Sequence, residues 1–217
     1  MQTVNDIRAQ FKFKLLHKDF IEDKSGVKLL EIPFAQFVAD ERFIFGTINN
    51  EWNVRELEWY DSQSLSVYDI KGNIPAVWKQ VASNSGIINS NYGYLVYSKE
   101  NCSQYDSVLA ELKRQPTSRR AIMIYTRPSI QQEYNIDGMS DFICTNNVQY
   151  LIRNGRLHAY VNMRSNDAIY GYKGDWFWQS IILNRLAGDL GAESGQIIWN
   201  CGSLHIYEKH FKLLGEF

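Results

Sequence analysis

Residues 148–163 read VQYLIRNGRLHAYVNM, and this stretch decides the fold class of the chain. Apolar side chains alternate with neighbouring positions over 148–152 and again over 157–163. Between the two runs lies Asn154-Gly155, a dipeptide typical of two-residue hairpin turns because both residues tolerate positive φ. The stretch therefore predicts two antiparallel strands joined by a tight turn.

Helical spacing of apolar residues recurs on both sides of this hairpin. Thr3 and Asp6 are spaced as a capping box before a first amphipathic helix. Further helices are predicted over three ranges, 54–60, 105–113 and 176–190. Pro116 ends the second of these, because proline disfavours a helical conformation in the residue before it.

Two more strands complete the predicted elements. One covers 27–32, after a turn at 24–26, and the other covers 196–207, where Gly202 interrupts the run. Residues 83–93, rich in Ser, Asn and Gly, are predicted to be irregular. Because strands and helices mix without a regular βαβ rhythm, we expect an α+β fold, a mixed sheet packed by helices, in a single domain over 1–217.

The composition fits one compact core and excludes several classes of protein. The chain has 217 residues, of which 45% are hydrophobic and 22% are charged. Its 23 Lys and Arg against 24 Asp and Glu give a net charge of -1, so neither nucleic acid nor a membrane surface is predicted as a partner. No apolar run is long enough for a membrane span or a secretory signal, which predicts a soluble cytoplasmic protein.

The three cysteines, Cys102, Cys144 and Cys201, lack the spacing of a disulfide framework or a zinc site, so free thiols and no metal are predicted. Taken alone, each is interpreted as a small buried core thiol. Cys144 and His205 also have the chemistry of a nucleophile and a base, but an isolated histidine of this kind is commonly structural. These two residues alone do not establish a Cys-His hydrolase.

Two arginine-containing segments could bind a phosphate. Arg119 and Arg120 are adjacent, and Arg164-Ser165 ends the second hairpin strand. A planar guanidinium suits a dianionic phosphate and a serine hydroxyl adds a donor, although paired arginines are also common on solvated surfaces. Glu56 and Glu58 are two apart on a predicted helix, so at most one of them faces an apolar site, where it could transfer protons.

Six ordered blocks of this sequence resemble the thymidylate synthase superfamily, and within it the phage-type branch that hydroxymethylates deoxycytidylate. The resemblance extends from about Phe20 to Phe211, and its blocks are 55–60, 89–93, 118–120, 138–146, 162–167 and 202–207. It implies the thymidylate synthase-like fold and a nucleophilic Cys144, whose thiolate adds to C6 of the pyrimidine and activates C5. Glu56 matches the glutamate that organises proton transfer around the base, and Tyr92 lines the same pocket.

The resemblance also implies a nucleotide phosphate site shared between subunits. Arg164 and Ser165 match its ligands in one subunit, whereas Arg119 and Arg120 match the pair that reaches the neighbouring subunit's phosphate. An obligate homodimer is therefore expected. The remaining nucleotide contacts that the resemblance implies are His205 and Tyr207 at the deoxyribose 3′-hydroxyl, and Lys24 at a phosphate-binding position.

One departure from synthases concerns the base. Where synthases have Pro-Phe-Asn, this chain has Lys173-Gly174-Asp175. A carboxylate at Asp175 accepts a hydrogen bond from the 4-amino group of cytosine and repels O4 of uracil, so dCMP is the expected substrate. Without the resemblance, Asp175 could equally be an acidic cap at the start of the 176–190 helix.

The resemblance implies 5,10-methylenetetrahydrofolate as cosubstrate, with Asp167 near the pterin and Trp78 on the folate side. A synthase reduces the transferred carbon with hydride from the folate, whereas a hydroxymethyltransferase lets water attack it. Val81 replaces the second aromatic of the synthase Trp-x-x-Trp pattern and Thr145 replaces a histidine, and both changes favour hydration.

Three alternatives stay open at the level of sequence. The first is methylation of dUMP, the second is hydroxymethylation of the ribonucleotide CMP, and the third is an idle relative that only binds nucleotides. The chain ends at Phe217, where relatives continue into a closing tail, and folate-dependent turnover depends most on such a tail.

Overall fold

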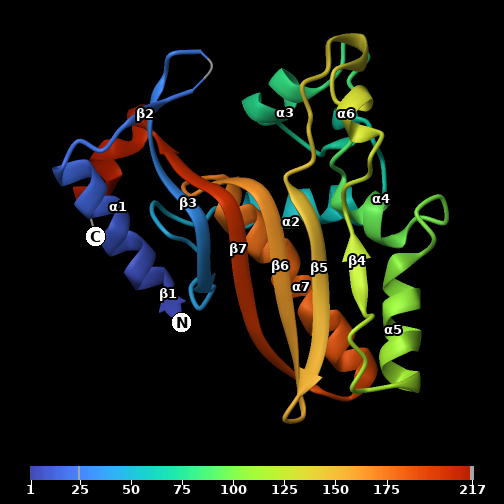
Figure 1. Cartoon of the computed structure of the whole chain (residues 1–217). Helices are drawn as coiled ribbons and strands as arrows, with labels where there is room; N and C mark the ends of the chain where they lie inside the picture. Colours follow the sequence, from blue (N-terminus) through green and yellow to red (C-terminus); the bar gives the residue numbers. More distant parts are fainter. Residues whose placement is uncertain (24, 216–217) are drawn as a thin grey trace. The chain divides into compact units, whose positions relative to one another are not determined.

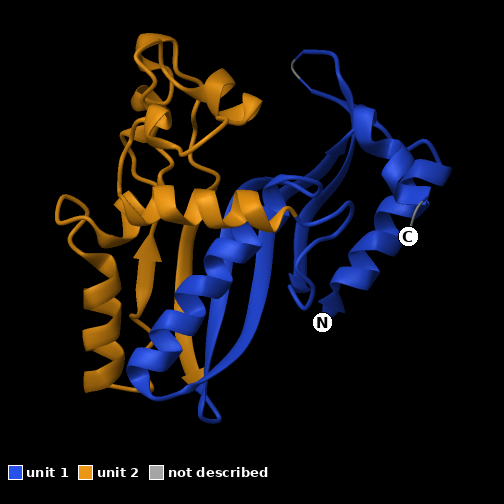
Figure 2. Ribbon diagram, turned by 180° about the vertical axis from the view of Figure 1, so that it is seen from behind, with its two compact units in different colours: residues 1–48, 153–217 blue, residues 49–152 orange. Residues whose placement is uncertain are grey.

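The fold is that of a computed structural model, which describes residues 1–23 and 25–215. Two compact units make up the chain (Figure 2). The first comprises residues 1–48 and 153–217, and the second comprises residues 49–152. The single domain expected from the sequence stays a prediction.

The first unit is built on a mixed sheet whose strand order is β1-β3-β7-β6 (Figure 1). β3 and β7 are antiparallel, β6 and β7 are parallel, and the short β2 pairs with β3. The bounds of these strands are Gln2–Thr3 for β1, Ile21–Glu22 for β2, Lys28–Val38 for β3, Arg156–Asp167 for β6 and Glu193–Tyr207 for β7. Parallel and antiparallel pairs in one sheet confirm the predicted mixed sheet.

Three helices accompany this sheet: α1 (Val4–Leu16), α7 (Gly171–Leu190) and the 3₁₀ segment η3 (Glu208–Gly215). The predicted capping box of α1 is present, with the Thr3 side chain accepting from Asp6 and the Asp6 carboxylate accepting from Thr3. α7 supplies the crossover that the parallel strands β6 and β7 require. Its buried face includes Trp178, Ile182 and Leu186, and it ends at Leu190 with Gly191, which has φ 64°, as its C-cap.

The second unit contains helices around an aromatic core and one antiparallel strand pair, β4 with β5. Its elements are α2 (Asn50–Asp61), η1 (Val67–Asp69), α3 (Ala76–Val81), α4 (Tyr92–Tyr97), α5 (Gln104–Arg114), β4 (Ile122–Ile124), α6 (Ile130–Glu133), η2 (Ile136–Gly138) and β5 (Thr145–Arg153). The helices predicted over 54–60 and 105–113 are confirmed as α2 and α5.

The predicted turn at Asn154-Gly155 is confirmed. β5 ends at Arg153 and β6 begins at Arg156, and the two residues between them have φ of 52° and 75°. Positive φ at both positions is what a two-residue turn of this kind requires.

Four predictions about the secondary structure are wrong in part. α7 begins at Gly171, five residues before the predicted start, and β7 runs unbroken through Gly202. The strand predicted over 27–32 continues to Val38, because its pairing with β7 resumes at Ala35 after Phe34, whose φ is 55°. Residues 83–93 are not all irregular, since the Asn91 side chain accepts a hydrogen bond from Tyr94 and thereby caps α4.

Among the described residues, no helix has both the length and the apolar character needed to cross a lipid bilayer.

Candidate active site

The environment of Cys144 is organised by its neighbour in the sequence. Cys144 immediately precedes β5 and is half-buried, with its sulfur 3.8 Å from the carbonyl oxygen of Phe142. Thr145 is fully buried, and its Oγ1 donates a hydrogen bond of 2.9 Å to the hydroxyl of Tyr92. The predicted pocket tyrosine is thus held beside the predicted nucleophile.

Asp141, three residues before Cys144, joins this segment to the loop that leads into α4. Its buried carboxylate accepts hydrogen bonds from the backbone N–H groups of Asn89 and Ser90, at 2.7 and 2.8 Å, and from the Ser90 hydroxyl. The Asn89 side chain in turn donates to the Asp141 carbonyl. A buried charge with this many donors fixes the backbone on both sides of it.

Aromatic rings from α2, α3 and α4 form one wall beside Tyr92. Tyr92 stacks on Tyr60 with ring centroids 5.5 Å apart, Tyr60 stacks on Trp59, and Trp78 meets the edge of Trp59 at 5.1 Å. α4 can approach α2 this closely because of Gly93, where a Cβ would lie 1.7 Å from the carbonyl oxygen of Tyr60.

α2 also carries the two glutamates considered as proton carriers. Glu56 is 9% exposed, whereas Glu58 is exposed and forms an ion pair of 2.9 Å with Lys71. The prediction that at most one of the two faces the interior is confirmed, and Glu56 is the one.

Arg119 and Arg120 lie on the surface of the second unit. The Arg119 carbonyl accepts a hydrogen bond from Gln149, and Arg120 donates to Glu111 at 3.1 Å. The Ser118 hydroxyl, together with Arg114 and Arg120, holds the pKa of Glu111 down at about 2. This carboxylate therefore anchors the arginine segment at neutral pH while both arginine side chains stay exposed.

In the first unit, the sheet register places predicted nucleotide contacts side by side. Ser165 is opposite Ser203, and Asp167 is opposite His205 on the adjacent parallel strand. His205 Nδ1 lies 3.3 Å from the carbonyl oxygen of Ser203, within hydrogen-bond distance. The rings of His205 and Tyr207 meet at 5.1 Å.

Asp175 lies inside α7 and not at its start. The N-cap position is Tyr170, which makes no side-chain cap, so the alternative interpretation of Asp175 as an acidic cap is wrong. Its carboxylate accepts a hydrogen bond of 2.7 Å from Nδ2 of Asn166 on β6. Arg164, two residues earlier on that strand, is exposed.

The first turns of α7 are bound to the loop over 39–47. The Tyr172 hydroxyl donates to the Glu41 carbonyl at 2.8 Å, Lys173 Nζ donates to the Thr47 carbonyl at 2.9 Å, and Trp176 Nε1 donates to the Ala39 carbonyl at 2.9 Å. Three side chains around Asp175 therefore hold this part of the helix in place.

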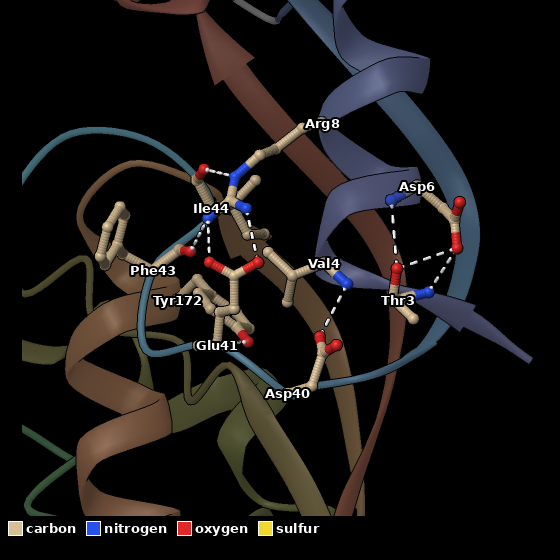
Figure 3. A network of polar contacts seen from close by, with 9 residues as sticks. All are labelled: Thr3, Val4, Asp6, Arg8, Asp40, Glu41, Phe43, Ile44 and Tyr172. Carbon is tan, nitrogen blue, oxygen red and sulfur yellow. Dashed lines mark hydrogen bonds and ion pairs between the residues drawn. The ribbon is translucent and has the colours of Figure 1, made fainter. Parts of the chain in front are cut away.

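Arg8 of α1 fixes the same loop (Figure 3). Its guanidinium forms two hydrogen bonds with the Glu41 carboxylate, at 2.7 and 2.8 Å, and donates to the carbonyls of Phe43 and Ile44. These bonds from Arg8 lower the pKa of Glu41 below its usual value. The position of Asp175 thus depends on a chain of contacts that begins in the first helix.

The structure also bears on the expectations for Lys24 and for the cysteines. Lys24 lies outside the described residues. Cys201 is buried as expected, whereas Cys102 is exposed, so its interpretation as a core thiol is wrong. Its φ of 64° places it in the turn before α5 rather than in a packed element. Within the described part of the chain, the three cysteines form no disulfide.

A cavity of about 570 Å³ in the first unit lies away from the predicted site. It is lined by Arg153, Asn154, Arg156, His158, Ser194, Gly195 and Gln196. Arg156 pairs with Glu193 at one end of the β6–β7 register, and Asp167 pairs with His205 at the other. Within residues 1–23 and 25–215, no three His, Cys, Asp or Glu side chains are grouped so that they could hold a metal ion.

Sequence reasoning assigned no role to Asp141 or Asn166, although both lie within the recognised blocks. Each is more than nine-tenths buried, and each makes a hydrogen bond to a distant segment. The available signal was their polarity in apolar surroundings, because buried polar groups in proteins are nearly always paired.

Comparisons with known proteins identify the family of the chain. Residues 44–217 match the family model of thymidylate synthase. The chain is 56% identical over 219 aligned residues to deoxycytidylate 5-hydroxymethyltransferase of Enterobacteria phage T4, covering 98% of this chain and 89% of that protein. It is 30% identical over 164 residues to thymidylate synthase of Bacillus subtilis subsp. natto, covering 72% of this chain and 57% of that one.

A solved structure gives the same fold. Thermostable thymidylate synthase A from Bacillus subtilis superposes with a TM-score of 0.73 at 24% identity, over 100% of this chain and 84% of that chain. The predicted thymidylate synthase-like fold is confirmed.

The chain belongs to the thymidylate synthase family. Within that family it is a transferase, and its high similarity is to the phage enzymes named for hydroxymethylation of deoxycytidylate.

Proposed function

We propose that the protein transfers a one-carbon unit from 5,10-methylenetetrahydrofolate to C5 of dCMP with addition of water, giving 5-hydroxymethyl-dCMP and tetrahydrofolate. The observation that carries the proposal is the carboxylate of Asp175 on α7, which accepts a hydrogen bond from Asn166 on β6. It stands in a chain that is 56% identical to a deoxycytidylate 5-hydroxymethyltransferase.

The nucleophile in this proposal is Cys144. Its thiolate forms a bond to C6 of the pyrimidine, and the electron pair of the C5–C6 double bond makes C5 nucleophilic. Glu56, a buried carboxylate in the same unit, transfers protons to and from the base. After C5 takes up the one-carbon unit, loss of the C5 proton would release tetrahydrofolate from that carbon and leave an exocyclic methylene. Addition of water to the methylene and elimination of the thiolate from C6 would then restore the C5–C6 double bond of the 5-hydroxymethylated ring.

The acid at Asp175 selects the base. An ionised carboxylate has only acceptors, so it pairs with the 4-amino group of cytosine and favours a proton on N3. A proton at N3 draws electrons from the ring and makes C6 more open to attack. Uracil presents a carbonyl oxygen at the same place and would be repelled.

The residues present fit a folate on the grounds of their chemistry. Trp78 is half-buried and offers an indole face, and the Asp167 carboxylate is oriented by hydrogen bonds that its Oδ1 accepts from the N–H groups of Ile169 and Tyr170. A carboxylate of fixed orientation suits the N–H groups of a pterin. When bound, the folate supplies the one-carbon unit at the oxidation level of formaldehyde, so its transfer with water needs no reductant.

We further propose a homodimer in which Arg119 and Arg120 bind the phosphate held by Arg164 and Ser165 of the partner subunit. His205 and Tyr207 would hold the sugar 3′-hydroxyl. The exposure of the Arg119 and Arg120 side chains supports this assignment.

The experiment that tests the function is release of tritium from [5-³H]dCMP, run with and without methylenetetrahydrofolate. We expect folate-dependent release and a hydroxymethyl product that carries ¹⁸O when the reaction is run in H₂¹⁸O. Release from [5-³H]dUMP with formation of dihydrofolate would instead identify a methylase. Binding of dCMP without any release would identify an idle relative, and Cys144→Ala is the control that must abolish release.

A further inference from the structure

A buried asparagine is the partner of the proposed base-reading acid. Asn166 is 3% exposed on β6, and its Nδ2 donates to Oδ2 of Asp175 at 2.7 Å. The two residues are nine apart in the sequence and belong to different elements, so this contact depends on the packing of α7 against the sheet.

The other end of the Asn166 amide is left without a partner. Its Oδ1 is buried, and no donor among the described residues hydrogen-bonds to it. Buried carbonyl groups are nearly always paired, so an unpaired one in a native fold requires an explanation. Turning the amide over would place its oxygen against the Asp175 carboxylate, where two acceptors repel each other. The Asn166 amide is therefore oriented so that its nitrogen donates to Asp175 and its oxygen is left without a hydrogen bond.

The packing around this pair is also adjusted to it. Gly171, the first residue of α7, faces the hydrogen bond, and a Cβ there would lie 2.9 Å from Nδ2 of Asn166 and 3.7 Å from Oδ2 of Asp175. A separation of 2.9 Å from the donor nitrogen is too close for a carbon atom, so glycine leaves room for the bond.

We propose that Asn166 is a positioning residue for base recognition: its amide fixes the rotamer of the Asp175 carboxylate so that this acid, and through it the site, prefers cytosine over uracil. The inference rests on the proposed function of Asp175 as the base reader. Asn166 acts through Asp175 and need not touch the nucleotide.

Equilibrium binding of dCMP and dUMP tests the role, because it requires neither folate nor turnover. Asn166→Ala should lower the ratio of dCMP to dUMP affinity by about tenfold, the order expected for loss of one hydrogen bond to a charged group. Asn200→Ala is the matched control. It removes a hydrogen-bonded asparagine from the adjacent strand, four register positions away, and should leave the ratio unchanged.

A merely structural role predicts different results. If the role is only structural, Asn166→Ala would weaken the binding of dCMP and dUMP equally, or would only lower the midpoint of urea unfolding. Either result overturns the proposal, and so does an unchanged ratio of dCMP to dUMP affinity. In an Asp175→Asn background, Asn166→Ala should change the ratio of dCMP to dUMP affinity little further. If it lowers the ratio there by as much as in the wild type, the two residues act independently and the proposal is contradicted. If Asn166→Ala does not fold, Gly171→Ala tests the same hydrogen bond and should lower the ratio with both polar side chains still present.

These outcomes are distinguishable from failure of the proposed function. Absence of tritium release by the wild type would refute hydroxymethylation, while the binding ratios would still report on Asn166. If Asp175→Asn leaves the wild-type preference intact, the base reader itself is wrong and the role of Asn166 fails with it.

Discussion

Thr145 Oγ1 lies 2.9 Å from the hydroxyl of Tyr92, and this bond joins the residue after Cys144 to the first turn of α4. Tyr92 also stacks on Tyr60, so the bond fixes the end of a ring whose face is already packed. Thr145 thus organises the aromatic wall by a hydroxyl contact.

Replacing Thr145 by Val should therefore lower dCMP turnover by about tenfold, because one partner of the Tyr92 hydroxyl is lost while the volume of the side chain is kept. The folding cost should be about 1 kcal/mol, the usual net value of one hydrogen bond. Tritium release and urea unfolding measure the two effects. Thr145→Ser keeps the hydroxyl and should retain most of the activity, and full activity of Thr145→Val would show that the bond has no part in the site.

Asp175→Asn should reverse the base preference. The amide offers a donor toward O4 of uracil, so kcat/KM for dCMP should fall by about 10³- to 10⁴-fold while dUMP becomes a substrate for tritium release. Asp189→Asn makes the same change at an exposed position of α7 and should leave both values unchanged. Retention of the dCMP preference in Asp175→Asn would remove this residue as the base reader.

The shared phosphate site can be tested with two inactive variants. A mixture of Arg119→Ala and Cys144→Ala should recover activity after subunit exchange, because mixed dimers contain one site with both groups intact. Random exchange makes half of the dimers mixed, so about a quarter of wild-type tritium release is expected. Mass spectrometry of differently tagged subunits must first show that exchange occurred. Mixed dimers that remain inactive would contradict a site built from two subunits.

Sequence patterns identified those parts of the fold that depend on local interactions. The Thr3 capping box and the Asn154-Gly155 turn are confirmed, because each is specified by residues within one turn of chain. The start of α7 was placed five residues too late, since its first turn is held by bonds from Tyr172 and Lys173 to a loop more than 120 residues earlier. Helical periodicity carries no information about contacts of that range.

The candidate site divides in the same way. The resemblance implied roles for Cys144 and Glu56, and the departure from synthases implied one for Asp175; these roles stay predictions. The resemblance did not identify Asn166, because the need for a donor at Asp175 is visible only when β6 and α7 are packed together. A polar residue that lies in a block of the resemblance without a predicted chemical role is thus a candidate for a residue that positions another side chain.

The contacts of Arg8 predict how the stability of the first unit depends on pH. Arg8→Met should lower the free energy of unfolding by about 1–2 kcal/mol at neutral pH, because the half-buried guanidinium donates to two backbone carbonyls and to Glu41, whose exposure screens the ion pair. Hydrogen bonds from Arg8 lower the folded-state pKa of Glu41 from its ordinary value of 4.5. The contribution of this pair is therefore fully present above about pH 4.5 and is lost as pH falls through the lowered folded-state pKa.

Urea unfolding from pH 7 to pH 3 should show the difference between wild type and Arg8→Met shrinking only in the acid range. Lys12→Met, which removes a cation from the same helix, should show no such pH dependence, and a constant difference for Arg8→Met across the range would mean that its carbonyl contacts alone stabilise the loop.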